Sequence, residues 1–186
     1  FKVNEADKVL VKRIELIGNN VLSDSFIKER IETREAGAFS SITNSGTYNK
    51  DAFERDMMRL SQFYWDEGYV KVRVGKPSIE LSPDRSQIYI RVAIEEGERF
   101  QTGPIDIMGD FLPDAPKDVL MKRVRLKEGG WFSSTKLKET INSIGEVYKD
   151  QGYAYVNLVP NTSVSETKKQ VALNIEIDKG PKIRIG

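Results

Sequence analysis

Two pairs of neighbouring carboxylates are the residues of this sequence best suited to acid–base or metal chemistry. Asp66-Glu67 and Glu95-Glu96 could share a proton or contribute ligands to a calcium site. Both pairs lie at the ends of predicted elements, where neighbouring carboxylates are usually solvated. We therefore expect neither pair to be catalytic and neither to bind a metal.

Cysteine and histidine are both absent from the 186 residues of the chain. Their absence removes thiol nucleophiles, serine–histidine–aspartate triads and the usual zinc ligand sets. An enzyme built from this sequence would need carboxylate or metal chemistry, and no clustered ligand pattern is present. We expect a protein that is not an enzyme and that carries no cofactor.

Three consecutive aromatic residues, Phe63-Tyr64-Trp65, could stack on the bases of a nucleic acid. The net charge is only +1, so there is no strong electrostatic case for binding nucleic acid or an anionic membrane. Only Tyr64 lies on the apolar stripe of the helix described next, and we expect the three rings to pack within the protein. For Trp131, an exposed contact and a cover over the helix pair remain alternatives.

The aromatic residues belong to the stretch around which the chain is organised, residues 49–81. Its apolar residues recur at spacings of four, three and four, which places them on one face of a helix: Phe53, Met57, Leu60 and Tyr64. Asn49 is suited to cap the start of this helix, and Gly68 to end it in a left-handed conformation. The alternating valines that follow predict a strand over 70–81.

The same arrangement returns at a constant offset of 84 residues. The stripe is repeated by Leu137, Ile141, Ile144 and Tyr148. Ser133 or Ser134 offers the cap, Gly152 repeats the stop, and a strand is predicted from Ala154 to about Val164. Such internal similarity indicates two copies of one small module.

The order of elements in each copy is strand, short helix, long helix, strand, strand. We predict an α+β fold of two tandem modules, each a three-stranded mixed sheet with two antiparallel helices on one face. The predicted modules span 8–98 and 99–180. Residues 1–7 are expected to be the tail of a preceding module and 181–186 the start of a following one, as in an excerpt from a longer array.

The composition fits this organisation. A hydrophobic content of 39% and a charged content of 31% are typical of globular domains. No apolar run approaches the roughly 20 residues that a membrane-spanning helix needs. Each module has about 80–90 residues, a size that folds alone around a small core.

Three sequence features, found in this order, resemble POTRA domains, which are periplasmic repeats of outer-membrane assembly factors. They are Ile17-Gly18-Asn19, the stretch from Phe63 to Tyr69, and Ser82-Pro83-Asp84 before an alternating strand. The order recurs in the second copy, with Gly109-Asp110 in place of Gly18-Asn19. Two further features resemble the third and fourth modules of such an array. They are the long loop of the first copy with Tyr48-Asn49-Lys50 after it, and Gly152-Tyr153-Ala154-Tyr155 in the second copy.

In that family the modules are not enzymes. The resemblance implies a periplasmic scaffold that recruits unfolded outer-membrane proteins and docks accessory lipoproteins. It also implies neighbouring POTRA modules and a C-terminal membrane barrel in the full-length chain, with no nucleic-acid partner. The alternatives are a secretion pore for a partner protein, an organelle import homologue, and a cell-division or structural interaction module without a barrel.

The resemblance makes the second strand of each module the expected sheet edge, and two prolines support this independently. Pro77 and Pro160 interrupt these strands, and proline is mostly confined to edges and bulges because it cannot donate to a ladder. An edge can add a strand from another chain. The candidate partner-binding residues are Val70, Lys71, Val72, Arg73, Val74, Ile79, Leu81, Tyr155, Val156, Asn157, Leu158 and Val159.

We expect the apolar side chains of these strands to face the core, so that the strand backbone does the recruiting. The loop over 33–48 is long for a compact domain, and partner contact and mobility remain alternatives for it.

Overall fold

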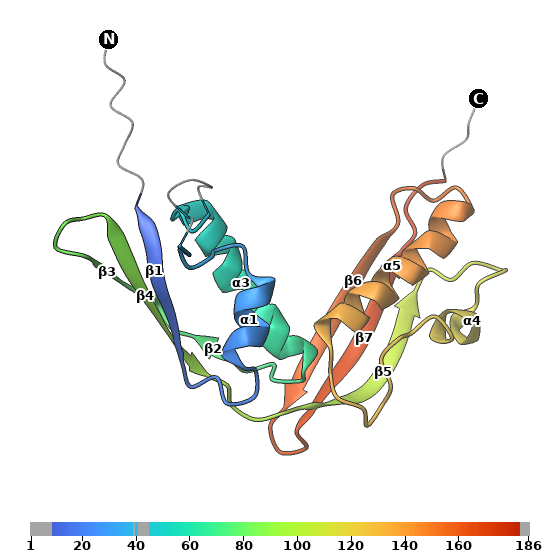
Figure 1. Cartoon of the computed structure of the whole chain (residues 1–186). Coiled ribbons are helices and arrows are strands. Elements are labelled where there is room, and N and C mark those ends of the chain that lie inside the picture. Colours follow the sequence, from blue (N-terminus) through green and yellow to red (C-terminus); the bar gives the residue numbers. More distant parts are fainter. Residues whose placement is uncertain (1–8, 39, 41–44, 183–186) are drawn as a thin grey trace, which may run out of the picture. The chain divides into compact units, whose positions relative to one another are not determined.

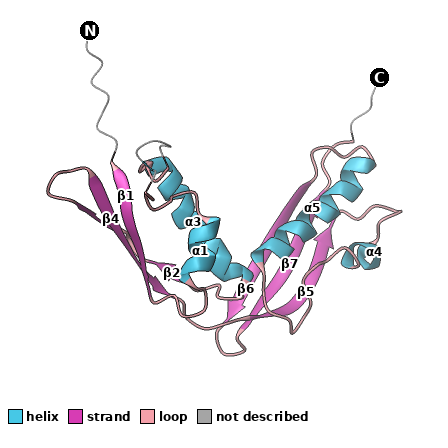
Figure 2. Ribbon diagram, viewed as in Figure 1, coloured by secondary structure: helices cyan, strands magenta, loops and turns pink. Residues whose placement is uncertain are grey.

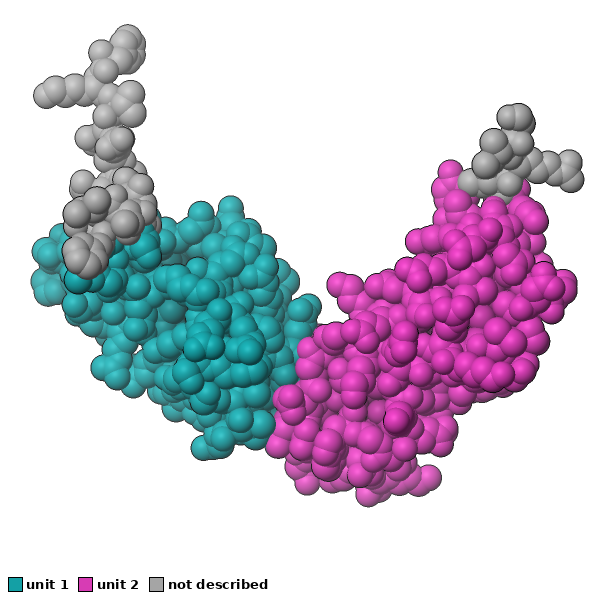
Figure 3. Space-filling view, turned by 45° about the vertical axis from the view of Figure 1, so that its right-hand side comes forward, with its two compact units in different colours: residues 1–64, 71–97 teal, residues 65–70, 98–186 magenta. Residues whose placement is uncertain are grey.

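The computed structural model describes residues 9–38, 40 and 45–182. The chain divides into two compact units, coloured separately in Figure 3: residues 1–64 with 71–97, and residues 65–70 with 98–186. The predicted tail over 1–7 lies outside the described residues, as do residues 183–186 of the predicted following module.

The sheet of the first unit is mixed, and its central strand is β4 (Gln87–Glu95). β1 (Leu10–Ile17) runs parallel to β4 on one side. On the other side β2 (Arg73–Val74) and β3 (Ser78–Leu81) pair with β4 in the antiparallel sense. The strand that comes last in the unit therefore lies in the middle of its sheet.

Two helices cover one face of this sheet, α1 (Asp24–Arg30) and α3 (Lys50–Asp66), as Figure 1 shows. The last two residues of α3 group with the second unit. Alternate residues of β4 point into the core and are almost fully buried, whereas the residues between them are exposed. The buried set is Ile88, Ile90, Val92 and Ile94.

The second unit repeats the same order of elements (Figure 2). β5 (Gln101–Gly109) precedes α4 (Lys117–Met121) and α5 (Ser134–Asp150), and β6 (Asn157–Ser165) and β7 (Gln170–Asp178) follow. β7 is central, with β5 parallel on one side and β6 antiparallel on the other. The predicted α+β fold of tandem modules is confirmed.

The caps of the long helices are those that the sequence predicts. The Asn49 side-chain oxygen accepts a hydrogen bond from the Ala52 N–H at 2.9 Å, and Ser133 caps α5 in the same manner. Gly68 and Gly152 follow the two helices with φ of +89° and +88°. Only glycine adopts this conformation without strain, which explains why both helices stop there.

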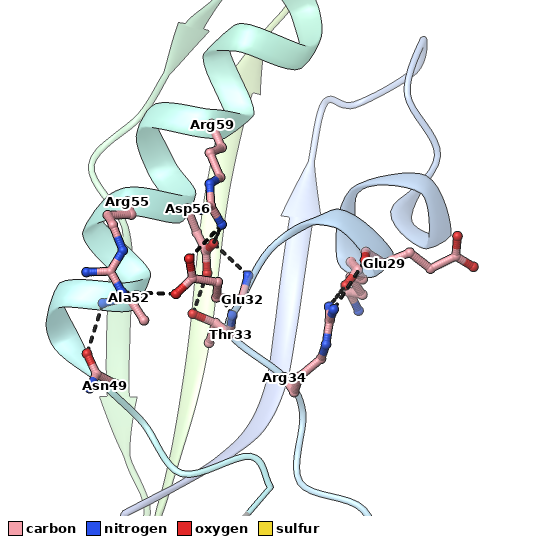
Figure 4. Close-up of polar contacts among 10 residues, drawn as sticks. Glu29, Glu32, Thr33, Arg34, Asn49, Ala52, Arg55, Asp56 and Arg59 are labelled. Carbon is pink, nitrogen blue, oxygen red and sulfur yellow. Dashed lines mark hydrogen bonds and ion pairs between the residues drawn. The ribbon is translucent and has the colours of Figure 1, made fainter.

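A buried polar residue ties each long helix to the chain that follows the short helix. Asp56 is fully buried and accepts from the N–H groups of Glu32 and Thr33, each at 2.7 Å, and from the Thr33 hydroxyl at 2.6 Å (Figure 4). In the second unit the buried Thr140 accepts from the Arg125 N–H at 2.9 Å. In both units a buried side chain of the long helix thus accepts a backbone N–H from the segment after the short helix.

The predicted bounds of the second strand in each module are wrong at several points. In the first unit the strand begins at Arg73 instead of residue 70, and residues 75–77 separate β2 from β3. Pro77 lies directly before β3, where its missing N–H removes a donor. In the second unit β6 begins at Asn157 instead of Ala154 and continues to Ser165.

Candidate functional site

Each sheet has two edges, and the candidate site depends on which of them remain free. In the first unit the edges are β1 on one side and β2 with β3 on the other. In the second unit they are β5 and β6. An edge strand presents unpaired N–H and C=O groups that another strand can bind.

β3 is an open edge. The Ser82 N–H donates to the Gln87 carbonyl at 2.8 Å, and the same register continues to Ser78 opposite Arg91. Because inward and outward backbone groups alternate along an antiparallel strand, the backbone groups of Ile79 and Leu81 point away from β4. In the part of the chain that the structure describes, no strand pairs with this side of β3.

The side chains of β3 are more exposed than the sequence predicts. Ile79 and Leu81 lie opposite the buried Ile90 and Ile88, which places them on the core side of the sheet. They are nevertheless 44% and 51% exposed, so the prediction that they form part of the core is wrong. An edge strand has a neighbour on one side only, which leaves its side chains half covered.

β6 is the corresponding open edge of the second unit. It pairs with β7 at every residue, including Pro160 opposite Ile175, and no described strand pairs with its other side. A proline is compatible with a continuous ladder where its ring nitrogen faces away from the partner strand. Leu158 packs against the core, whereas Val159 and Val164 are exposed.

Five of the predicted binding residues lie outside these strands. Val70, Lys71 and Val72 precede β2, and Val70 packs against the core of the second unit. Tyr155 and Val156 precede β6 in a turn. The glycine that ends each long helix is followed by a turn before the strand starts. The apolar alternation already begins within this turn, so the sequence pattern predicted a strand that starts too early.

Of the predicted residues, seven lie in β2, β3 or β6. They are Arg73, Val74, Ile79, Leu81, Asn157, Leu158 and Val159.

The outer edge of β1 is closed by the loop between α1 and α3. The Val11 carbonyl accepts from the Ala36 N–H at 2.7 Å, and the Val11 N–H donates to the Gly46 carbonyl at 2.7 Å. Further along the strand, the Ile14 N–H donates to Glu35 Oε1 at 2.8 Å. These groups are therefore not available to an added strand.

The outer edge of β5 is closed in the same way. The Thr102 N–H donates to the Gly130 carbonyl at 2.7 Å, and the Thr102 carbonyl accepts from the Gly129 N–H at 2.8 Å. The Ile105 N–H donates to Glu128 Oε1 at 3.1 Å. Each unit thus has a first strand whose outer edge is closed, from Val11 to Ile14 and from Thr102 to Ile105, and a second strand whose outer edge is open.

The POTRA model, described as surface antigen variable number repeat, matches residues 9–97 and 103–180. The chain belongs to the POTRA family. Its two POTRA repeats are of the type found in the assembly factor BamA.

Several curated relatives carry the name outer membrane protein assembly factor BamA. The protein from Neisseria meningitidis is 27% identical over 98% of this chain, and that from Nitratidesulfovibrio vulgaris is 26% identical over 100% of it. The match spans 23% of the length of each of these two relatives. The POTRA pair thus corresponds to less than a quarter of these proteins.

A solved structure shows the same fold. The crystal structure of Haemophilus influenzae BamA POTRA3-5 matches 94% of this chain and 67% of its own length, with a TM-score of 0.73 and 17% identity. A second match, POTRA1-2 of Omp85 from Anabaena, covers 94% of this chain with a TM-score of 0.52. At these identities the likeness concerns the POTRA fold alone.

The carboxylate pairs are structural in these POTRA units. Asp66, which groups with the second unit, accepts hydrogen bonds from the start of α5: from the hydroxyls of Ser133 and Ser134 and from the N–H and hydroxyl of Thr135. Burial raises the pKa of Asp66, but these donors outweigh it and lower the pKa overall. The expectation of a solvated carboxylate is wrong here.

Glu96 is also engaged within its own unit. Its Oε1 accepts from the Tyr64 hydroxyl at 2.9 Å and from the Val21 N–H at 2.8 Å. Its neighbour Glu95 forms a long, exposed ion pair with Arg73 at 3.7 Å.

The aromatic residues pack as structural groups. Tyr64 is fully buried, and the ring of Phe63 meets that of Phe26 edge-on at 6.0 Å between centroids. Trp131 is 47% exposed, and the Arg99 guanidinium lies 4.2 Å from the centre of its ring. Of the alternatives for Trp131, the structure supports the exposed one, with a cation stacked on the ring.

Among the described residues of this POTRA pair, no group of three or more acidic side chains is placed to hold a metal ion. Within the same residues, every helix is too short or too polar to cross a membrane.

Proposed function

We propose that this POTRA pair forms part of the periplasmic region of an outer-membrane β-barrel assembly factor and binds unfolded outer-membrane proteins by strand addition. The observation that carries the proposal is the open edge, which recurs at β3 and β6. The names of the curated relatives supply the biological setting.

Strand addition suits a protein that must handle many different clients. Backbone hydrogen bonds are nearly independent of sequence, and transmembrane β-strands share a pattern of alternating apolar residues. An added strand beside β3 would bring every second side chain next to Ile79 and Leu81, which are exposed on the core side. Affinity should be weak, because a disordered client loses conformational entropy when it becomes ordered.

The remaining partners follow from the same proposal. In the full-length protein we expect neighbouring POTRA modules, a C-terminal membrane barrel and accessory lipoproteins that dock on the periplasmic region. We expect no nucleic-acid partner, since the net charge is +1.

An NMR titration tests the proposal directly. A peptide with the alternating pattern of an outer-membrane strand is added to the chain, and backbone amide shifts are followed. We expect weak binding with shifts that run along β3 and β6. A peptide of the same composition with N-methylated backbone groups is the matched control, because it keeps the side chains but cannot form a ladder. Equal shifts with both peptides, or none at millimolar concentration, would rule out strand addition.

A further inference from the structure

The closed edges of the two units follow one plan, although their loops differ in length. In each unit one residue of the first strand is held at both its N–H and its carbonyl by the loop, namely Val11 and Thr102. In each unit an isoleucine N–H further along the strand is held by a glutamate, Glu35 for Ile14 and Glu128 for Ile105. The same bulge separates the two contacts, since the pairing register shifts there in both strands.

The glutamates occupy equivalent positions in the repeat. Ile27 and Leu120, the buried residues of the two short helices, lie 93 residues apart, and so do Glu35 and Glu128. The long helices keep an offset of 84 residues instead. The first unit therefore carries nine additional residues between these points.

The additional residues lie between the two loop residues whose backbone groups bind the first strand. Gly129 and Gly130 are adjacent in the second unit, whereas their counterparts Ala36 and Gly46 are separated by residues 37–45. Both counterparts nevertheless bind Val11. A Cβ on Gly46 would lie 2.5 Å from the Ala36 Cα, so the two ends of the insertion meet against the strand. The hydrogen bonds that close the edge at Val11 are therefore kept, although nine residues are inserted between the two residues that form them.

A glutamate closes an edge in a way that a further strand cannot. Its carboxylate accepts the outward N–H but presents no backbone groups for the next strand, so the sheet ends there. In the first unit Glu35 Oε1 also binds the Lys28 ammonium at 2.8 Å. Burial raises the pKa of Glu35, but the Lys28 ammonium and the Ile14 N–H outweigh it and hold the pKa below its ordinary value.

We propose that Glu35 and Glu128 are specificity-determining residues, which close the first-strand edge of each unit and so direct an added strand to β3 and β6. This inference rests on the proposed function for the identity of the added strand. The closure itself is a property of each unit alone. Without the glutamates, the outward N–H groups of Ile14 and Ile105 would be free to donate to a strand of a client or of another copy of the chain.

The first measurement needs no client. Amide hydrogen exchange is compared in the whole chain for Glu35→Ala, Glu128→Ala and the double variant. We expect exchange of the Ile14 N–H to accelerate about tenfold or more in Glu35→Ala, because a hydrogen bond to a charged group is lost. A smaller acceleration is expected for Ile105, whose bond to Glu128 is longer. Unchanged exchange at both amides would overturn the inference.

The second measurement locates the added strand. The peptide titration is repeated with a spin label on the peptide, which broadens the NMR signals of the amides nearest to the label. In the unsubstituted chain, broadening is expected at β3 and β6 only, and in the double variant also at β1 and β5. No binding to the unsubstituted chain would refute the proposed function. Binding at β3 and β6 without any gain at β1 and β5 in the double variant would refute the role of the glutamates alone.

Two further pairs of variants keep the inference testable if the double variant folds poorly. Glu35→Gln and Glu128→Gln retain a side-chain oxygen and should retain the closure. Glu29→Ala and Glu139→Ala remove exposed carboxylates from the two units and should change neither exchange nor peptide position. If these two controls opened the edges as strongly as Glu35→Ala and Glu128→Ala, the effect would be one of net charge, and the inference would fail.

Discussion

Asp56 and Thr140 lie 84 residues apart and have the same structural role in their two units. Each is fully buried on the long helix, and each accepts a hydrogen bond from backbone that follows the short helix. Asp56 binds three donors through two oxygens, whereas Thr140 accepts one N–H and donates to the Lys136 carbonyl. Both units therefore have a hydrogen bond from the segment after the short helix to the long helix, but the acceptor is a carboxylate in one unit and a hydroxyl in the other.

Replacing Asp56 with alanine should destabilise the first unit by about 2–4 kcal/mol, because the backbone N–H groups of Glu32 and Thr33 lose their acceptor and the one on Thr33 is buried. Asp56→Thr should cost less, since a hydroxyl can still accept one of them. Urea unfolding followed through NMR intensities of β4 and β7 amides reports the two units separately. Asp51→Ala, an exposed carboxylate on the same helix, should cost less than about 1 kcal/mol. An equal loss in both variants would contradict the assigned role.

Replacing Gly68 with alanine should destabilise the chain by more than about 1 kcal/mol, because φ there is +89°. An added Cβ would also lie 2.8 Å from the Phe100 carbonyl oxygen, so the neighbouring backbone would have to shift. Gly37→Ala is the matched control, since its Cβ would meet nothing within 4 Å. Thermal unfolding of the two variants makes the comparison, and equal midpoints would show that the turn tolerates a side chain.

Replacing Ile79 with proline should weaken peptide binding at β3 severalfold or more, because it removes an outward N–H without removing a bond to β4. Ile79→Ala keeps the N–H and removes only the exposed side chain, so it should weaken binding less. The peptide titration measures both affinities. If the alanine variant lost as much affinity as the proline variant, side-chain contact instead of backbone pairing would carry recognition.

Acid should loosen the turn between β3 and β4. Hydrogen bonds from the Ser82 hydroxyl and then from Ser86 lower the pKa of Asp84 from 3.8 to about 2. A carboxyl group with a lowered pKa stabilises the fold above its unfolded pKa, and this contribution is lost as the pH falls through the folded value. The amide shifts of Ser86 and Gln87 should therefore change between about pH 4 and pH 2.

Asp84→Asn provides the control for this pH dependence, because its amide oxygen can accept the bonds that Oδ1 accepts, from the Ser82 hydroxyl and the Ser86 N–H, and the amide does not titrate. Its amide shifts at Ser86 should stay constant over the same pH range. A transition of equal size in the variant would assign the change to another carboxyl group.

Much of the fold could be predicted from the sequence because its signals are local. The stripe that includes Leu60 and Tyr64, and the caps at Asn49 and Gly68, depend on residues within one or two turns of each other. The offset of 84 residues then predicted the second unit from the first. Pro77 and Pro160 also marked the edge strands correctly, since a missing N–H restricts where a strand can lie.

Other features depend on contacts between distant segments. Alternation along β3 assigns Ile79 to the core side of the sheet, but it does not show whether anything covers that side, and the structure leaves Ile79 exposed. Sequence reasoning did not single out Glu35 or Glu128, although their equal distance from the short helices was a usable signal. Each binds an N–H more than 20 residues away, across the short helix.

The sequence by itself thus determined the repeat, the fold class and the strands that lie at the edges, since each follows from spacing along the chain. Only the tertiary structure decided which edges are open. An edge is closed when a loop happens to place an acceptor against an outward N–H, and that placement depends on how strand, helix and loop pack together in three dimensions.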